Sequence, residues 1–477
     1  MPPSTPRTIL ITGLGTVSAL GSGIDVLWQG LLEGRSGLGP IHRIDATGFR
    51  SSLGGDVPDF TAKTLVPKHY RKAVKVMARD TELAVGAALF AVQDANLETR
   101  ATTDDNPTYS PSRTGCHIGA GLIAAETDEL APAIATATDE SGAFRERLWG
   151  TNTDAGGNAG MNNLPPLWLL KYLPNMLACH VTILHGCEGP SNTITCAEAS
   201  GLLSLGESLR VIQRDDADCC FAGGTESKLN LMGFARLDIT GRLAPTPTTP
   251  TPTTTNASDF VRPFDPDATG TLAAEGGGVV ILEEAAHAHA RGTTPYAEVL
   301  GFGAAQSPPP FPVVDLSHTN HDTQTATDTN ESPSDGLRYA IEAALHDAGI
   351  SPADIDAIVP TAAGIPEPDA TEAQALRAVF GDRLGEIPLV TIRPNLGDCQ
   401  AGNGALQVAA ACLCLREQKL PARLHAGTPA PGLDAGNAPA RQATLGCMLV
   451  CSTSLGGQNA AVVLRHTPPK SPRPANT

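Results

Sequence analysis

Thr195-Cys196-Ala197-Glu198-Ala199-Ser200-Gly201 is the stretch that decides how this chain folds. An alanine- and leucine-containing segment with small residues at its start begins here, and a second one begins at Ala401-Gly402-Asn403-Gly404. Both segments predict helices. Glu198 is the only charged residue in the first stretch, so an ionisable group stands at the start of a helix among small, uncharged neighbours.

A pattern in the first half of the chain recurs in the second half. Segments 81–94 and 337–348 place apolar residues at three- and four-residue spacing, which predicts two amphipathic helices. Each segment closes with a similar phrase and is followed by a strand candidate. The phrases are Asp94-Ala95-Asn96-Leu97 and Asp347-Ala348-Gly349-Ile350, and the strand candidates are 115–119 and 355–360. This repetition indicates two related βαβαβ halves.

The composition is that of a chain with a sizeable core and an acidic surface. The 477 residues are 41% hydrophobic and carry a formal charge of −17, which argues against nucleic acid as a partner. The apolar run Leu406 to Leu415 is too short for a membrane span, and the segment Met1 to Arg7 lacks the apolar core of a signal peptide. We therefore expect a cytoplasmic protein without a membrane span.

Neither the cysteines nor the glycine turns indicate a metal or a cofactor. The eleven cysteines lack paired C-x-x-C spacing and lie mostly among small apolar residues, which favours buried free thiols. Gly13 and Gly15 follow an apolar strand, but Ser18 stands at the third glycine position of the dinucleotide fingerprint and no acidic partner follows convincingly. We expect no cofactor and no metal.

Further motifs give the chain a resemblance to a known family. From about residue 7 to about residue 466 it resembles the β-ketoacyl synthases, the condensing enzymes of fatty-acid and polyketide assembly. The segment from Gly189-Pro190 to Gly201 matches without a gap. The other matching stretches are 8–37, Leu173-Pro174-Asn175-Met176, Ala222-Gly223-Gly224-Thr225-Glu226, Arg262-Pro263-Phe264-Asp265-Pro266-Asp267, Ala274-Glu275-Gly276 and Ser454-Leu455-Gly456-Gly457-Gln458-Asn459.

The resemblance implies the thiolase-like α/β fold. In that fold two mixed sheets and a buried central helix pair form a five-layer α-β-α-β-α sandwich. We expect an N-terminal half over 1–285, a C-terminal half over 295–466 and a disordered tail over 467–477. Two segments rich in proline and polar residues, 245–255 and 306–334, are expected to be mobile surface insertions, because they contain too few apolar residues to order themselves.

The same resemblance locates a catalytic set in which the reactive groups are replaced. An active family member uses a cysteine to hold the acyl chain, and two histidines to support decarboxylation of malonyl-carrier protein and steady the enolate. Counting back from Asp369 and Glu372 locates the first histidine position. The matching residues are Glu198 for the cysteine, Thr361 for the first histidine, Asp398 for the second, Arg393 for the family's lysine, and Thr453 and Leu455 at the gate.

Two roles are open for the residues at these positions. In the first, Glu198, Asp398 and Arg393 form a hydrogen-bonded charge cluster that plugs the former reactive centre. In the second, the two carboxylates, one with a raised pKa, act as general acid and base on a bound acyl or polyketide chain. Cys196 shares the face of Glu198 if the backbone is extended there, but a buried, inert thiol is favoured. We place His180 and His185 on a strand that leads into this region.

The implied function is that of a partner subunit. Family members without the cysteine are familiar as chain-length factors, which dimerise with an active ketosynthase and shape the tunnel for the growing product. There a glutamine usually replaces the cysteine, whereas this chain has Glu198. The alternatives are an enzyme with new acid–base chemistry centred on Glu198 and Asp398, and a homodimeric acyl-chain-binding protein. Acyl carrier proteins are acidic, and a predicted helix that carries Lys68, Arg71, Lys72, Lys75 and Arg79 is a candidate docking patch.

Overall fold

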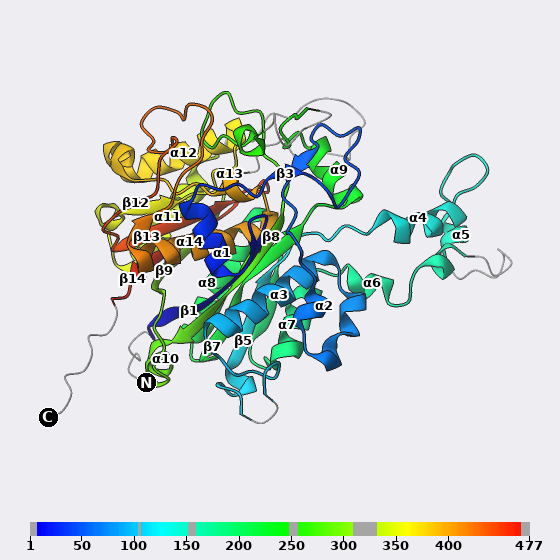
Figure 1. The fold of residues 1–477 in the computed structure, drawn as a ribbon, viewed down its shortest axis with the longest axis horizontal. Coiled ribbons are helices and arrows are strands. Elements are labelled where there is room, and N and C mark those ends of the chain that lie inside the picture. The colour runs from blue at the N-terminus through cyan, green and yellow to red at the C-terminus, as the bar shows by residue number, and fades with distance from the viewer. Residues whose placement is uncertain (1–6, 104–105, 151–158, 248–255, 309–331, 469–477) are drawn as a thin grey trace.

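A computed structural model describes residues 7–103, 106–150, 159–247, 256–308 and 332–468. Within them one ten-stranded mixed sheet runs through the molecule, with helices on its outer faces and between its two halves (Figure 1). Most of each segment expected to be mobile (248–255, 309–331 and 469–477) lies outside the described residues.

The two halves of the sheet have the same strand order. In the first half β1 is followed by β8, β7, β5 and β6, and in the second half β9 is followed by β14, β13 and β10. The N-terminal strands are β1 (Ile9–Ser18), β5 (Thr114–Gly119), β6 (Ser191–Ile194), β7 (Cys219–Ser227) and β8 (Glu275–Glu284). The C-terminal strands are β9 (Ala297–Gln306), β10 (Ala357–Val359), β13 (Cys447–Thr453) and β14 (Gln458–His466). The doubling seen in the sequence is therefore a doubling of the fold.

The two halves are joined edge to edge. Antiparallel pairing of Ile9 to Ile11 in β1 with Ala297 to Val299 in β9 links them, so the two expected sheets form one continuous ladder. β6 ends the sheet on one side, and its outer edge has no strand partner in the described part of the chain.

The helices form three layers around the two half-sheets. Between the half-sheets lie α8 (Ser200–Gln213) and α14 (Asn403–Glu417), and α14 is buried at every position from Asn403 to Leu415, as expected of a helix that is apolar all round. A Cβ on Gly201 would stand 2.7 Å from the carbonyl oxygen of Ala401, so the close approach of these helices requires glycine there. The outer layers contain α3 (Arg79–Asp94) and α7 (Met176–His185) on one side, and α11 (Asp335–Ala348) and α12 (Pro366–Phe380) on the other.

Shorter elements decorate this core. Helices α4, α5 and α6 lie on an arm that projects from the body (Figure 1). The short helices are α1 (Ile24–Leu32), α2 (Ala62–Leu65), α4 (Thr127–Thr136), α5 (Glu146–Trp149), α6 (Trp168–Lys171), α9 (Leu231–Ile239), α10 (Ala285–Ala290) and α13 (Arg393–Leu396). The two-residue strands are β2 (Gly21–Ser22), β3 (Gly39–Pro40), β4 (Leu53–Gly54), β11 (Lys419–Leu420) and β12 (Arg441–Gln442).

Two local predictions are wrong. The basic stretch is not one helix but two 3₁₀ turns, Lys68–Tyr70 and Ala73–Val76, and the extended backbone at Met77 and Ala78 separates them from α3. His180 and His185 lie in α7 rather than on a strand, since Leu177, Val181 and Leu184 recur at helical spacing and are buried.

Two other expectations concern the state of the cysteines and the presence of a membrane span. All eleven cysteines are free, and most are buried, which confirms the prediction of buried thiols. Among the described helices, none combines the length and apolar character needed to cross a bilayer.

Candidate functional site

Glu198 lies in a sharp turn that opens the central helix α8. The turn is a single 3₁₀ turn, Ala197–Ala199, and Ala197 has a φ of 46°, an uncommon conformation for a residue with a Cβ. The Ser200 hydroxyl holds the turn, because it accepts from the Cys196 amide and donates to the Ala197 carbonyl, both at 2.7 Å. This backbone directs a side chain that is only 2% exposed towards the middle of the molecule.

Arg242 is the charge partner of Glu198. Its guanidinium donates to Oε1 of Glu198 in a close ion pair, and the Leu455 amide lies 3.3 Å from Oε2. The backbone carbonyl of Glu198 accepts from the Ser452 hydroxyl at 2.9 Å. Both carboxylate oxygens therefore have donors, and the closing strand turn supplies one of them.

Asp398 lies on the other side of Arg242. Its Oδ2 is 3.7 Å from the Arg242 guanidinium, and its Oδ1 accepts from Arg393 at 2.7 Å. The side chains of Gln400 and Asn403 each donate to the carboxylate at 2.7 Å. Burial alone would raise the pKa of Asp398, but the two guanidinium groups and these hydrogen bonds outweigh burial and hold the pKa below its usual range.

Thr361 connects this charge cluster to the gate. Its carbonyl accepts from Nε of Arg393 at 3.1 Å, and its hydroxyl accepts from the Thr453 amide at 2.9 Å. Its own amide donates to Glu372 at 2.7 Å. Thr361 thus links Arg393, Glu372 and the Thr453 strand by hydrogen bonds.

Asp369 and Glu372 of α12 hold the Thr361 loop from behind. Asp369 accepts from the amides of Ala363, Gly364 and Phe264 at 2.7 to 3.0 Å, which fastens two loops to one carboxyl group. Burial raises the pKa of Asp369 to about 7, and burial also raises the pKa of Glu372.

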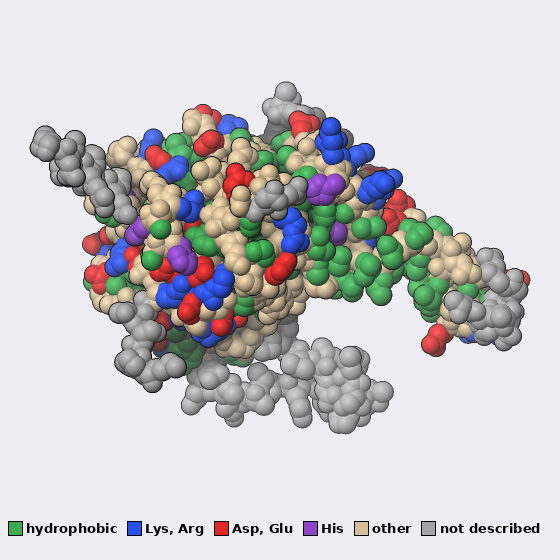
Figure 2. All heavy atoms as spheres, turned by 90° about the horizontal axis from the view of Figure 1, so that it is seen from below, with side chains coloured by type: hydrophobic (Ala, Val, Ile, Leu, Met, Phe, Trp, Pro, Cys, Tyr) green, Lys and Arg blue, Asp and Glu red, His purple; other side chains and the backbone are tan. Residues whose placement is uncertain are grey.

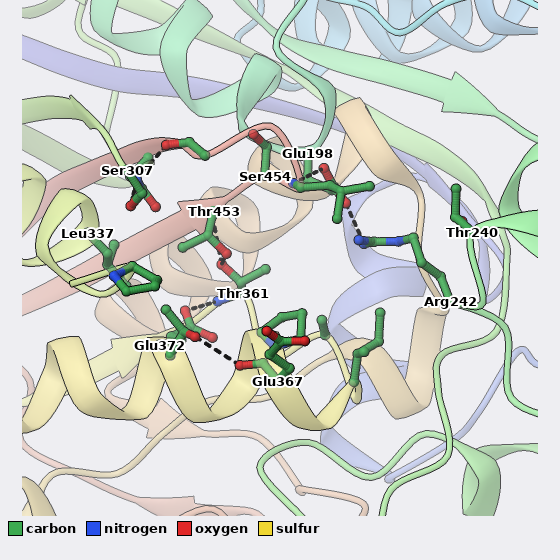
Figure 3. A pocket seen from close by; sticks show the side chains of 18 of the residues that line it. Glu198, Thr240, Arg242, Ser307, Leu337, Thr361, Glu367, Glu372, Thr453 and Ser454 are labelled. Atoms are coloured by element: carbon green, nitrogen blue, oxygen red, sulfur yellow. Dashed lines mark hydrogen bonds and ion pairs between the residues drawn. The ribbon is translucent and has the colours of Figure 1, made fainter. Parts of the chain in front are cut away.

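A cavity of about 290 Å³ opens onto these groups (Figure 3). Its walls include apolar side chains such as Leu337 and Ile365, with Glu367 at its exposed rim. The site residues that line it are Glu198, Arg242, Thr361, Arg393, Thr453 and Leu455. Asp398 is not among the lining residues and stands behind the two arginines, to which it is bonded.

The structure brings the predicted site residues together, but the cation that pairs with Glu198 is not the one expected. Arg393 was expected to join Glu198 and Asp398, whereas it pairs with Asp398, and Arg242 pairs with Glu198 and also faces Asp398. Sequence reasoning missed Arg242 because it follows α9 in a loop, 44 residues from Glu198, with no motif around it. The roles of the six positions stay predictions.

One requirement of the interpretation in which Glu198 and Asp398 act as general acid and base is not met by Asp398. It needs a carboxyl group of raised pKa in the pair, and the pKa of Asp398 is lowered instead. The carboxyls beside the cavity whose pKa is raised are Asp369 and Glu372, and backbone amides hold both of them.

Cys196 was expected to be a buried thiol, but it is only partly buried. Burial raises the pKa of this thiol, so little thiolate forms near neutral pH. The buried histidines are engaged elsewhere: His117 bonds Ser208, His180 bonds Tyr70 and His185 bonds Thr99. No histidine of the described chain lines this cavity.

Comparisons with known proteins agree with this architecture. Residues 6–288 match the family "Beta-ketoacyl synthase, N-terminal domain", and residues 312–427 match "Beta-ketoacyl synthase, C-terminal domain". The chain is 27% identical over 464 residues to the 3-oxoacyl-[acyl-carrier-protein] synthase 2 of Staphylococcus aureus strain COL, with 97% of this chain and 99% of the relative aligned. It is 28% identical over 463 residues to the enzyme of that name from Coxiella burnetii, over 96% of this chain and 98% of the relative.

Solved structures show the same fold. The structure titled "The ishigamide ketosynthase/chain length factor" matches with a TM-score of 0.74 and 28% identity over 97% of this chain and 100% of that chain. A β-ketoacyl synthase from Burkholderia phymatum STM815 matches with a TM-score of 0.73 and 23% identity, again over 97% and 100% of the two chains. The expected thiolase-like α/β fold is confirmed.

Proposed function

The chain belongs to the β-ketoacyl synthase family, and we propose that it is a non-condensing member that pairs with an active ketosynthase in the manner of a chain-length factor. The observation that carries this proposal is the buried ion pair of Glu198 and Arg242 at the family's cysteine position. A carboxylate held by a guanidinium cannot take an acyl group from a thioester as a thiolate does. Thr361 and Asp398 likewise lack the imidazole chemistry of the two histidines.

The arm that carries α4 to α6 and the outer edge of β6 support the proposal of a pairing surface. Leu167 and Leu169 on the arm are 62% and 63% exposed, and Ile183 on α7 is 56% exposed. Figure 2 shows hydrophobic side chains gathered along the arm and the adjoining face of the body. The free edge of β6 offers backbone groups to a second strand. An apolar face next to an open strand edge favours a stable protein partner.

An acyl carrier protein is the second proposed partner. The side chains of Lys68, Arg71, Lys72 and Lys75 are all exposed and lie within eight residues of one another. Such a cluster suits the acidic surface of a carrier protein, and it would attract that surface even though the whole chain carries a charge of −17.

The proposal is tested by reconstitution with a ketosynthase that carries the full Cys-His-His set, ideally the one encoded beside this chain. Native mass spectrometry should find a one-to-one heterodimer. The chain alone, given acyl- and malonyl-carrier protein, should neither gain acyl mass nor release condensed product, whereas the mixture should do so. Condensation by the purified chain alone would end the proposal.

A gain-of-function variant tests the assignment of the positions. Glu198→Cys with Thr361→His and Asp398→His removes both carboxylates that face Arg242. The triple variant leaves Arg242 with neither of these carboxylates and also takes Asp398 from Arg393, so we expect more condensation when Arg242→Ala is added. Activity of the triple variant equal to that of the quadruple variant would contradict this assignment.

One alternative keeps an observation in its favour. The cavity of about 290 Å³ could hold part of an acyl chain in a homodimeric binding protein. That function predicts a homodimer that retains a fatty acid or acyl-carrier protein when purified without a ketosynthase. An acid–base enzyme would instead show turnover that Glu198→Gln abolishes.

A further inference from the structure

A second cavity, of about 240 Å³, lies far from the charge cluster and shares no lining residue with the first. It is found where β7 begins and α7 ends. Strand β5 runs from Thr114 on the wall of this cavity to Gly119, which lies against the Ser200 backbone two residues after Glu198. The cavity and Glu198 therefore lie at opposite ends of β5. Its walls come from the loop after α3, the start of β5 and the end of α7. No part of the proposed function uses it.

One polar group on its wall lacks a partner. His185 is 4% exposed and lines the cavity, and its Nε2 has no hydrogen-bond partner in the described structure. Its Nδ1 lies 2.9 Å from the Thr99 hydroxyl, which itself accepts from the Ala101 amide at 3.3 Å. In the described structure the Thr99 hydroxyl has no other acceptor for its proton, so donation to Nδ1 is the arrangement that leaves this buried hydroxyl satisfied.

This hydrogen-bond pattern assigns the tautomer of the His185 ring. Burial lowers the pKa of His185 to about 3, so the imidazole is neutral and carries a single proton. With Nδ1 accepting from Thr99, that proton lies on Nε2. A buried N–H without an acceptor is unfavourable, and a ligand oxygen placed against it would remove that cost.

The other residues on the wall of this cavity favour an uncharged ligand. Leu97, Phe221 and the two prolines Pro107 and Pro111 are apolar, and the prolines have no amide proton to offer. Arg100, the one cationic side chain on the wall, is half exposed and already paired with Glu188 at 2.8 Å. The Tyr109 hydroxyl donates to the buried carboxylate of Glu283. The carboxylate of Glu98 also lines the cavity, but this side chain is exposed and accepts from the Thr102 hydroxyl. An anion would therefore find no unpaired cation on the wall, and a cation would find no unpaired buried carboxylate.

We propose that this cavity is a binding site for a small, neutral, largely apolar molecule with one carbonyl or hydroxyl oxygen, which accepts a hydrogen bond from Nε2 of His185. The site is independent of the proposed pairing with a ketosynthase. Its position at the start of β7 leaves the first cavity open, so both can be occupied at once.

The test uses two probes of nearly the same shape. Acetophenone has a carbonyl oxygen where α-methylstyrene has a methylene group. Ligand-detected NMR titration of the full chain should show acetophenone binding about five- to tenfold more tightly, the ratio that one net hydrogen bond supplies. In His185→Phe the two affinities should become equal. Crystals soaked with acetophenone should place its oxygen within hydrogen-bond distance of Nε2.

Several outcomes would overturn the proposal. They are equal affinities in the unaltered chain, a preference for acetophenone that survives His185→Phe, binding of neither probe, and soaked crystals in which only an ordered water bonds Nε2. Should His185→Phe fail to fold, Thr99→Val serves in its place. That variant keeps the ring but removes the partner that fixes the proton on Nε2, so the preference should shrink rather than vanish.

Discussion

Replacing Arg242 by methionine should reveal how strongly the charge cluster depends on this residue. The change removes the cation that pairs with Glu198 and lies 3.7 Å from Asp398. At that distance, two unit charges interact by about 4.5 kcal/mol with an effective dielectric constant of about 20. Asp398 keeps Arg393, but Glu198 keeps only the Leu455 amide, at 3.3 Å. Leaving a buried charge uncompensated costs about 3–5 kcal/mol.

The assay is thermal unfolding at pH 8. For 477 residues the unfolding entropy is about 1 kcal/mol per degree, so Arg242→Met should lower Tm by about 3–5 °C. The matched control is the double variant Arg242→Met with Glu198→Gln, which removes both charges and should recover most of the loss.

A double-mutant cycle of Arg242→Met and Glu198→Gln measures the coupling free energy between these two residues. We expect Glu198 and Arg242 to be coupled by at least about 2 kcal/mol, since each is buried and touches the other. If the effects of the two changes simply add, within about 0.5 kcal/mol, the pair contributes no specific stabilisation. The idea of a charge cluster that replaces the reactive centre would then be wrong.

Three further predictions concern other parts of the chain. Burial raises the pKa of Asp369 to about 7. The stability that this carboxyl group contributes is therefore complete below about pH 4, the usual pKa of an aspartate, and is lost as the pH rises through 7. Asp369→Asn should lower the Tm of the protein but flatten the decline of Tm between pH 5 and 8, and an unchanged slope would refute this. Cys196→Ser should leave reconstituted condensation unchanged, because burial keeps that thiol protonated, whereas a large loss of activity would make Cys196 a nucleophile. Leu169→Glu on the arm should weaken the heterodimer at least tenfold in native mass spectrometry, whereas Ile239→Glu, at a residue 84% exposed on α9, should leave it intact.

The fold could be predicted from the sequence because its signals are local and ordered. The apolar spacing in 81–94 and 337–348 marks α3 and α11 to within two residues at their starts. The repeated phrases at their ends mark the internal doubling. The uninterrupted spacing from Gly189 to Gly201 predicts that Glu198 stands at the family's reactive position. The two histidines of α7 show the limit of that reasoning, because the composition of a short apolar segment does not separate helix from strand.

The sequence by itself determined the thiolase-like fold, and its resemblance to the family predicts that Glu198, Thr361 and Asp398 stand at the positions of the cysteine and the two histidines. Only the tertiary structure decided which cation neutralises Glu198, that Asp398 stays ionised behind two arginines, and that β1 and β9 join the halves into one sheet. The physical reason is distance along the chain. Periodicity and motif spacing are properties of neighbouring residues, whereas an ion pair between residues 44 positions apart exists only after packing removes both groups from water.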